Sequence, residues 1–407
     1  MENLLKRQKL ERDSLLSRSY VPRLFEDEME KYLDSSPVKL ITGPRRAGKS
    51  VFALRMLREK NFAYLNFDDA ALVEAFDENG IIEALDAVYP GFQYIVLDEV
   101  QNLPQWNDWV GKLYRRGYNM IITGSNSNLL SKEMESKLTG RYVSKEIFPF
   151  SLGEFLGARK EDGRSAGEMA DEYLQMGGYP EIVNNREIAA NYLSALFDSI
   201  ISKDIVRRFK VRKSEELYSL ADLLMANYAS EVTFGGIAQS LGIGSENTVA
   251  KFISHLQMAY LFYLLPRFDF KFRSMRKAPR KVYAVDNGLI TAKGYEISPN
   301  LGRRLENLVF IELLRRGYVP GKSLFYYRTR RDDKEVDFVC RTGTKVTELI
   351  QVCYEMNTIG AISRETSALD KASKELGCGR MRIIVWDKPE MAVDSHYNVV
   401  RFCDWAK

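Results

Sequence analysis

The sequence predicts an α/β protein that begins with a parallel β-sheet and continues into helical and mixed segments. Between Val38 and Phe148, five short runs rich in β-branched and aromatic residues alternate with helical patterns, which is typical of a parallel sheet with crossover helices. A helical pattern follows from about residue 151, and further strand-like runs lie beyond residue 301. Because one domain takes roughly 150 residues, a chain of 407 residues has room for two to three domains.

The composition is that of a globular protein. Hydrophobic residues make up 45% and charged residues 28%, which excludes collagen-like and largely disordered chains. The formal charge of +4 is too small to indicate a partner unless the charges cluster. The longest apolar stretch, residues 259–266, has eight residues, whereas a membrane-spanning helix needs about 20. The amino end intersperses charges among leucines, so we expect no secretory signal, a cytoplasmic location and no membrane partner.

The first strand-like run, VKLIT at residues 38–42, leads into the octapeptide GPRRAGKS and then a helical segment. This pattern predicts a phosphate-binding loop, in which glycines let backbone N–H groups point inward and the start of the helix attracts phosphate. Lys49 is expected to contact the β- and γ-phosphates of a nucleotide, and Ser50 to ligate Mg²⁺. The expected binding residues are Gly43, Pro44, Arg45, Arg46, Ala47, Gly48, Lys49, Ser50 and Val51.

Two acids follow the third strand-like run, QYIVL, at residues 93–97. A nucleotide site needs a carboxylate for the metal at the end of a neighbouring strand, so Asp98 is the expected second Mg²⁺ ligand. Glu99 can polarise a water molecule for attack on the γ-phosphate, which predicts hydrolysis rather than binding alone. The alternative is that Glu99 only caps the helix that follows.

Small polar residues follow the fourth run, NMIIT, which ends before Gly124. Ser125 or Asn126 can contact the γ-phosphate or its water, although either could instead cap a helix. Arg141 precedes the fifth run, and an arginine near a subunit edge can act as a finger on a neighbouring active site. A structural ion pair is the alternative for Arg141. The expected catalytic residues are Lys49, Glu99, Asn126 and Arg141, and Ser125 is expected to contact the nucleotide.

Seven motifs together resemble a widespread family of prokaryotic AAA-like P-loop ATPases: GPRRAGKS, LDEVQNLPQWNDWV, ITGSNS, LTGRY, FPFSLGEFL, GGYPE, and LEN with EVDF. Members of that family carry a C-terminal domain of unknown function that is similar to restriction-endonuclease-like PD-(D/E)XK folds. The likeness covers nearly the whole chain. It implies ATP as the nucleotide, ATP hydrolysis with Mg²⁺, a winged-helix segment in the middle of the chain, and oligomers in some relatives.

With this resemblance, the chain divides into four expected segments. A P-loop AAA-like ATPase domain takes residues 1–150, and a helical lid or connector takes residues 151–213. A winged-helix-like segment spans residues 214–290, and a PD-(D/E)XK-like α/β domain spans residues 291–407.

The middle segment has the pattern of a nucleic-acid reader. Residues 233–258 predict a short helix, a glycine-containing turn and a second helix that Ser245 caps, which is helix-turn-helix geometry. Residues 267–281 hold seven basic residues, one acid and three phenylalanines, like a basic wing, and residues 203–213 hold six basic residues and one acid. Such clusters can follow DNA phosphates, although both could equally be solvated faces or subunit contacts.

The last segment has the outline of a nuclease without the full set of catalytic groups. Nucleases of the PD-(D/E)XK type need a helix acid, a strand acid and an E-x-K pair to hold Mg²⁺ and activate water. Glu306 and Asp337 stand where the two acids belong, but Gln351 and Cys353 occupy the E-x-K positions. Glu348 alternates onto the other face of its strand. We therefore expect a retained fold without nuclease activity.

Together these patterns favour an ATP-hydrolysing molecular switch or remodelling ATPase that acts on DNA or on a partner protein and assembles into a homo-oligomer. Two alternatives stay open. One is an ATP-regulated DNA nuclease, which Gln351 and Cys353 disfavour. The other is a nucleotide-gated DNA-binding scaffold with little turnover.

Overall fold

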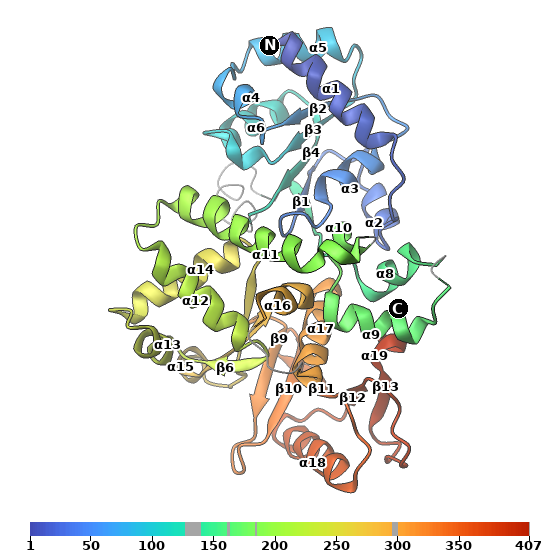
Figure 1. Ribbon diagram of the computed structural model, residues 1–407, viewed down its shortest axis with the longest axis vertical. Coiled ribbons are helices and arrows are strands. Elements are labelled where there is room, and N and C mark those ends of the chain that lie inside the picture. The colour runs from blue at the N-terminus through green and yellow to red at the C-terminus, as the bar shows by residue number, and fades with distance from the viewer. Residues whose placement is uncertain (127–139, 161–162, 184, 295–299, 407) are drawn as a thin grey trace. The chain divides into compact units, whose positions relative to one another are not determined.

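The chain forms two compact units (Figure 1). The computed structural model describes residues 1–126, 140–160, 163–183, 185–294 and 300–406. The first unit comprises residues 1–149 and 258–260, and the second comprises residues 150–257 and 261–407. The expected boundaries of the four segments stay predictions.

The first unit is built on a five-stranded parallel sheet in the order β2-β3-β4-β1-β5. Its strands are β1 (Val38–Thr42), β2 (Phe62–Asn66), β3 (Tyr94–Asp98), β4 (Asn119–Gly124) and β5 (Tyr142–Glu146). All five coincide with strand-like runs of the sequence, so the predicted α/β fold with a parallel sheet is confirmed. β4 lies between β1 and β3, so the residues that follow β1 and β3 are two strand spacings, or about 10 Å, apart.

Helices cover both faces of this sheet, as a parallel sheet requires. They are α1 (Glu2–Leu16), α2 (Glu26–Glu30), α3 (Lys49–Met56), α4 (Ala70–Glu74), α5 (Gly80–Val88) and α6 (Trp106–Arg115). Successive strand residues point to opposite faces, so Leu40 and Ile41 belong to two different core clusters. The first cluster packs the sheet against α1, α5 and α6, and the second packs it against α2 and α3.

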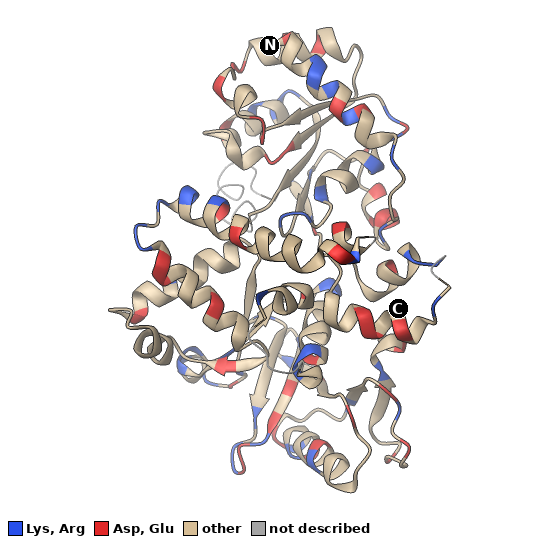
Figure 2. Cartoon of the chain, viewed as in Figure 1, with Lys and Arg blue, Asp and Glu red and all other residues tan. Residues whose placement is uncertain are grey.

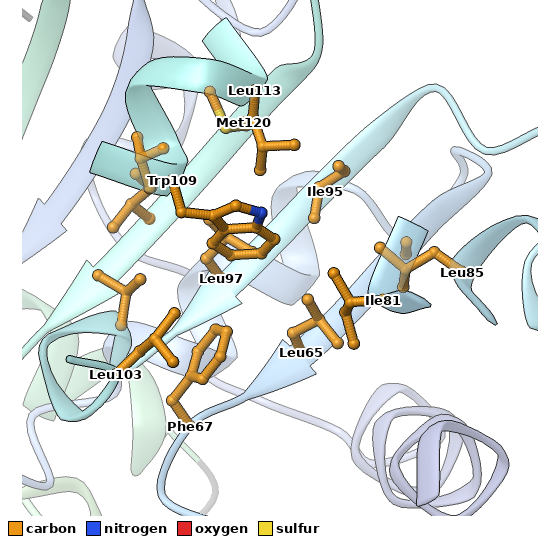
Figure 3. Packing of buried hydrophobic residues seen from close by; sticks show 14 of the residues in the cluster. Leu65, Phe67, Ile81, Leu85, Ile95, Leu97, Leu103, Trp109, Leu113 and Met120 are labelled. Carbon is orange, nitrogen blue, oxygen red and sulfur yellow. The ribbon is translucent and has the colours of Figure 1, made fainter. Parts of the chain in front are cut away.

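Figure 3 shows the first of these clusters, in which Trp109 of α6 packs among Leu97, Leu113 and Phe67. The rings of Phe67 and Trp109 meet edge to face, with their centroids 6.1 Å apart. Each leucine or isoleucine buried in this way contributes about 2 kcal/mol to the free energy of folding. This packing holds the strands rigidly and therefore holds in place the loops at their ends.

The second unit begins with a group of short helices, as predicted for this region. They are α8 (Leu152–Ala158), α9 (Ala166–Met176), α10 (Pro180–Val183) and α11 (Ala189–Ser199). Ser151 and Ser165 begin α8 and α9 with capping boxes, in which Glu154 and Glu168 complete the reciprocal hydrogen bonds. α11 continues into a π-helical stretch, Ile200–Arg207, where the basic cluster of residues 203–213 begins.

The middle of the second unit combines three helices with a small antiparallel sheet in the order β6-β8-β7. Its elements are α12 (Ser214–Ala226), β6 (Ser230–Val232), α13 (Phe234–Leu241), α14 (Glu246–Met258), β7 (Phe262–Pro266), α15 (Phe272–Lys277) and β8 (Arg280–Ala284). The helix, turn and helix predicted over residues 233–258 correspond to α13 and α14, whereas β6 and α15 were not predicted. The connection between β7 and β8 carries most of the basic stretch 267–281.

The last part of the second unit is a five-stranded mixed sheet in the order β13-β12-β11-β10-β9. Its elements are α16 (Asn287–Lys293), α17 (Leu301–Arg315), β9 (Leu324–Arg328), β10 (Glu335–Thr342), β11 (Lys345–Cys353), α18 (Ile359–Leu376), β12 (Met381–Val385), β13 (Asn398–Arg401) and α19 (Phe402–Trp405). β9, β10 and β11 pair antiparallel, whereas β11, β12 and β13 pair parallel. Across the part of the chain that the structure describes, no helix is both long and apolar enough to cross a membrane.

Candidate functional site

The octapeptide predicted to bind phosphate forms a loop between the end of β1 and the start of α3. Gly43 has φ 139°, and a Cβ at this position would overlap the carbonyl oxygen of Ile147. Gly48 precedes α3 with φ 96°, a left-handed conformation that glycine adopts at little cost. α3 begins at Lys49, so its unpaired N–H groups belong to residues of the predicted loop. Proteins commonly bind phosphate at such a glycine-rich helix start.

Lys49 and Glu99, predicted as catalytic partners, lie together. The Nζ atom of Lys49 donates a hydrogen bond to the carbonyl oxygen of Pro44 at 3.0 Å and lies 3.5 Å from Oε1 of Glu99. The side chain of Lys49 is 3% exposed. A buried ammonium needs such partners because it has lost its hydration.

Asp98, the predicted metal ligand, is buried at the end of β3 and accepts hydrogen bonds from three hydroxyl groups. Ser50 and Tyr64 donate to its two oxygens, each at 2.8 Å, and Thr123 donates to the same oxygen as Ser50. Burial raises the pKa of Asp98, as does the charge of Glu99, whereas the three hydroxyl groups favour the charged form. The two predicted Mg²⁺ ligands, Ser50 and Asp98, are therefore in direct contact.

Sequence reasoning missed Tyr64 and Thr123. Their only signal in the sequence is a hydroxyl group within otherwise apolar strands, and a tyrosine or threonine in a strand is common. The order of the sheet, which places β2 and β4 on either side of β3, brings both hydroxyl groups to Asp98.

Glu99 follows β3 in a left-handed conformation, with φ 51°. The Oε2 atom accepts hydrogen bonds from the backbone N–H of Ser125 at 3.1 Å and from its hydroxyl at 3.0 Å, and the amide of Gln101 also donates to it. Burial would raise the pKa of Glu99, but Lys49 and the hydrogen bonds from Gln101 and Ser125 outweigh it and lower the pKa. Ser125, predicted to contact nucleotide, thus contacts the predicted catalytic carboxylate. Gln101 was missed.

The remaining predicted residues of the first unit lie at various distances from this centre. Arg45 pairs with Asp68 at 3.7 Å, and Arg46 is exposed with φ 65°. Asn126 follows β4 and is partly buried. Pro44 and Ala47 are buried in the loop.

Val51 lines a cavity of about 90 Å³ beside α3. The N-terminal segment also lines it, through Leu15, Leu16 and Tyr20. Arg55 is a further lining residue, and its guanidinium pairs with Glu26 at 3.1 Å.

Arg141 is not brought to this centre within its own sheet. β1 and β5 run parallel, with Val38 opposite Tyr142 and Thr42 opposite Glu146. The loop follows Thr42, whereas Arg141 precedes Tyr142 at the other end of the sheet, about 13 Å along the strand direction. The guanidinium of Arg141 lies 5.6 Å from the ring centroid of Tyr114.

The middle segment presents a polar helix face beside its core. Val249 and Phe252 of α14 are buried, whereas Glu246, Asn247 and Lys251 are exposed. Figure 2 shows basic residues on α15. In the stretch 267–281, the exposed basic residues are Lys271, Arg273, Arg276 and Lys277.

The two acids predicted in the C-terminal segment surround a buried lysine that sequence reasoning missed. The Nζ atom of Lys281, on β8, lies 2.7 Å from Glu306, 2.5 Å from Glu335 and 3.2 Å from Asp337. Burial would lower the pKa of Lys281, but the three carboxylates outweigh it and raise the pKa above its ordinary value. The chain therefore supplies its own cation to this acid cluster.

Gln351 and Cys353 lie where alternation along β11 predicted them. Gln351 lies directly opposite Asp337 in the antiparallel ladder, because the adjacent residues Phe338 and Ile350 are paired. Cys353 is buried, and burial raises the pKa of its thiol to about 11. A thiol in that state is a poor nucleophile at neutral pH.

Three family comparisons cover most of the chain. Residues 35–156 match the family described as "AAA domain". Residues 167–297 match a domain of unknown function (DUF8612), and residues 301–400 match another (DUF4143).

Two uncharacterized proteins are similar over most of their lengths. One, from Methanocaldococcus jannaschii, is 33% identical over 368 residues, which span 86% of this chain and 81% of the relative. The other, from Haemophilus influenzae, is 33% identical over 349 residues, which span 81% of this chain and 85% of the relative.

A Walker-type ATPase of Pyrococcus abyssi has a similar solved structure. It is 14% identical, with a TM-score of 0.51 over 69% of this chain and 99% of that chain. This similarity and the AAA match confirm the predicted AAA-like P-loop ATPase fold. The predicted PD-(D/E)XK-like fold of the last segment stays a prediction.

Proposed function

This chain belongs to the family of AAA-domain proteins that includes these relatives from Methanocaldococcus jannaschii and Haemophilus influenzae, and we propose that it hydrolyses ATP to ADP and phosphate with Mg²⁺. The AAA-type fold supports ATP binding. The hydrolysis, the metal and the roles of individual residues are the proposal.

The observation that carries the proposal is the cluster of Lys49, Ser50, Asp98 and Glu99 at the carboxyl ends of β1 and β3. An ammonium, a hydroxyl and two carboxylates meet there from two separate motifs. The oxygen atoms of Ser50 and Asp98, 2.8 Å apart, are the hard ligands that Mg²⁺ prefers. When bound, Mg²⁺ would neutralise charge on the phosphate oxygens.

The residues of this chain would act as follows. The backbone N–H groups between Gly43 and Ser50 hold the β-phosphate, and Lys49 exchanges the carbonyl oxygen of Pro44 for phosphate oxygens. Glu99 accepts a proton from the water that attacks the γ-phosphorus, and the bond to the β-phosphate oxygen breaks. The lowered pKa of Glu99 keeps the carboxylate ionised but also makes it a weaker base, so the position of Glu99 beside Lys49 and Ser125 is what supports this role.

The cavity beside α3 is the proposed position of the base. It adjoins the loop through Val51, and apolar side chains such as Leu15 and Leu54 line it. A flat, mostly apolar base fits such a wall, while the guanidinium of Arg55 offers a polar edge.

The test is phosphate release by the wild type, Lys49→Ala and Glu99→Gln. We expect both variants to lose about 100-fold or more of the turnover, Lys49→Ala with weakened binding of a fluorescent ATP analogue and Glu99→Gln with binding retained. Lys60→Ala and Glu59→Gln are matched controls, because both side chains are exposed just beyond the end of α3. Turnover in Lys49→Ala equal to that of the wild type would refute the proposal.

We further propose that residues 214–290 form a winged helix that binds DNA. The order of helices and strands from α12 to β8, and the antiparallel order β6-β8-β7, support this proposal. α14 would read DNA through its exposed face, and the connection between β7 and β8 would follow the phosphates. The basic residues 203–213 would add phosphate contacts, so binding should weaken steeply as salt rises.

For the C-terminal segment we propose a PD-(D/E)XK-like fold without nuclease activity. The ammonium of Lys281 occupies the space among three carboxylates, and Gln351 cannot replace a charged ligand. Intact supercoiled plasmid after incubation with protein, ATP and Mg²⁺ is the expected result. Nicked or linear plasmid would favour the ATP-regulated nuclease instead.

A further inference from the structure

We infer that the connection between β7 and β8 binds single-stranded DNA, with Phe270 and Phe272 stacking on unpaired bases. The inference rests on the proposed DNA-binding function and deepens it, because it names the form of DNA that this surface fits. Its basis is a pair of exposed aromatic rings within a run of exposed cations.

Phe270 and Phe272 are 62% and 68% exposed. Among the residues that the structure describes, they are the only phenylalanines with this degree of exposure, and leaving such rings in water forgoes the free energy of burial. Phe270 is nevertheless held in place. Its ring packs edge to face on Phe268 at 5.4 Å, and the buried Phe268 packs in the same way on Phe325.

Cations surround these rings. Lys271, Arg273, Arg276 and Lys277 are exposed, and none of them forms an ion pair within the described ranges of the chain. The one acid of the stretch, Asp269, accepts a hydrogen bond from the backbone N–H of Lys271 at 2.7 Å. The connection between β7 and β8 therefore presents four exposed cations and the single acid Asp269 beside the rings.

Arg330, from the loop after β9, adds a further cation. Its guanidinium lies 5.5 Å from the centroid of the Phe270 ring, at the distance of a cation–π contact. The nearby acids of that loop are already paired, Asp332 with Lys371 and Asp333 with Arg328.

The order of residues distinguishes the kind of partner. From Phe270 to Arg273, aromatic and cationic side chains alternate one by one, and a single strand offers one base and one phosphate per nucleotide. Stacking of a base on an aromatic side chain contributes about 1–3 kcal/mol and needs an unpaired, accessible base face. In a duplex the bases stack on each other, so the two rings would lose this contact. An acidic protein would account for the cations but not for the alternating rings.

The experiment measures the fluorescence anisotropy of a labelled 30-nucleotide oligo(dT) and of a labelled 30-base-pair duplex with the full chain. We expect the wild type to bind oligo(dT) at least tenfold more tightly than the duplex. The double variant Phe270→Ala/Phe272→Ala should weaken oligo(dT) binding at least tenfold and change duplex binding less than twofold. Phe270→Trp/Phe272→Trp should restore it, because tryptophan also offers a ring face.

The charge variant Lys271→Gln/Arg273→Gln should act differently. It should lower the slope of log Kd against log salt by about 1.4, since each phosphate contact on a single strand contributes about 0.7. The aromatic variant should leave that slope unchanged. Ile359→Ala, at another exposed apolar side chain of the second unit, is the control and should bind as the wild type does.

The outcomes distinguish binding to single-stranded DNA from the proposed DNA binding in general and from the proposed ATP hydrolysis. Binding to duplex alone would overturn the inference but leave DNA binding intact, and binding to neither form would overturn both. Equal affinity of the aromatic variant and the wild type for oligo(dT), or tighter binding to single-stranded RNA than to DNA, would also overturn it. ATP turnover without DNA should be the same in all these variants, so a failure of the ATPase proposal would be seen independently.

Discussion

The carboxylate of Asp98 is buried and is held by hydrogen bonds from three hydroxyl groups. Burial penalises its ionised form and raises its pKa, and hydroxyl groups from Ser50, Tyr64 and Thr123 offset part of this penalty. Tyr64 and Thr123 come from strands on either side of β3, so they fix the carboxylate from both directions. These hydroxyl groups orient the proposed metal ligand before any nucleotide arrives.

Removing one of these hydroxyl groups should weaken the site without unfolding the sheet. We expect Tyr64→Phe to raise the Mg²⁺ concentration needed for half-maximal phosphate release by about tenfold or more, because a hydrogen bond to a charged group contributes about 1.5–3 kcal/mol and 1.4 kcal/mol corresponds to a factor of about ten. The same variant should show a smaller rise in melting temperature with Mg²⁺ and ADP.

Tyr94→Phe is the matched control for this change. Tyr94 lies on β3 of the same sheet, but its hydroxyl group contacts Asp34 rather than Asp98. Equal effects of the two variants on the Mg²⁺ requirement would contradict the role assigned to Tyr64.

Lys281 neutralises three carboxylates at once, so its loss should be costly. We expect Lys281→Met to destabilise the second unit by about 3–5 kcal/mol, because Glu306, Glu335 and Asp337 would keep their burial but lose their cation. Urea unfolding followed by tryptophan fluorescence would measure the shift. Lys277→Met, at an exposed lysine of the same stretch, should leave the midpoint unchanged. A Lys281→Met protein as stable as the wild type would show that the cluster does not depend on this ammonium.

The segment GGYP joins distant elements of the second unit through its backbone. Gly178 donates its N–H to Asp286 at 2.8 Å, and Gly288 donates to the same carboxylate at 2.8 Å. A Cβ at Gly178 would overlap the carbonyl oxygen of Phe150, which explains why glycine is needed there. The turn after α9 is therefore held against the start of α16 by one buried acid.

The protonation of Asp286 should make the second unit pH-dependent. Burial raises the pKa of Asp286 to about 6, although hydrogen bonds from Gly178 and Gly288 and the charge of Arg315 oppose the shift. Because this pKa lies above that of an unfolded aspartate, the folded state binds the proton more tightly, and the contribution to stability falls as pH rises through about 6.

We therefore compare the melting temperature of the wild type with that of Asp286→Asn at pH 5 and at pH 7. Relative to the variant, the wild type should be more stable at pH 5 than at pH 7. Asp394→Asn, at an acid outside this network, should show no such change. A difference between wild type and Asp286→Asn that stays constant over this range would contradict the shifted pKa.

Assembly is a property of the whole molecule, and Arg141 is where it can be tested. Because Arg141 lies at the end of the sheet opposite to the loop, it can act on a nucleotide only in a second copy of the chain. We expect Arg141→Ala and Glu99→Gln each to lose most ATP turnover, and a mixture of the two to regain part of it. Recovered activity requires a wild-type Glu99 in one subunit and a wild-type Arg141 in its neighbour. No recovery, together with a monomeric wild type by light scattering at the same concentration, would contradict a homo-oligomeric active form.

The sequence by itself was sufficient to determine the strands of the first sheet, the loop from Gly43 to Ser50 and the acids at 98 and 99. These features depend on local patterns, because a strand, a glycine-rich turn and a helix start are each encoded within about ten residues. The same locality explains why the helices α13 and α14 were predicted, whereas the short β6 and α15 were not.

Only the tertiary structure decided which side chains contact the buried acids Asp98 and Asp337. Tyr64 reaches Asp98 across 34 positions, and Lys281 reaches Asp337 across 56. Such contacts depend on strand order and on the packing of separate elements, which no local pattern encodes. For the same reason the distance between Arg141 and the loop could not be predicted from the sequence. The parallel register of β1 and β5 places the two at opposite ends of the sheet.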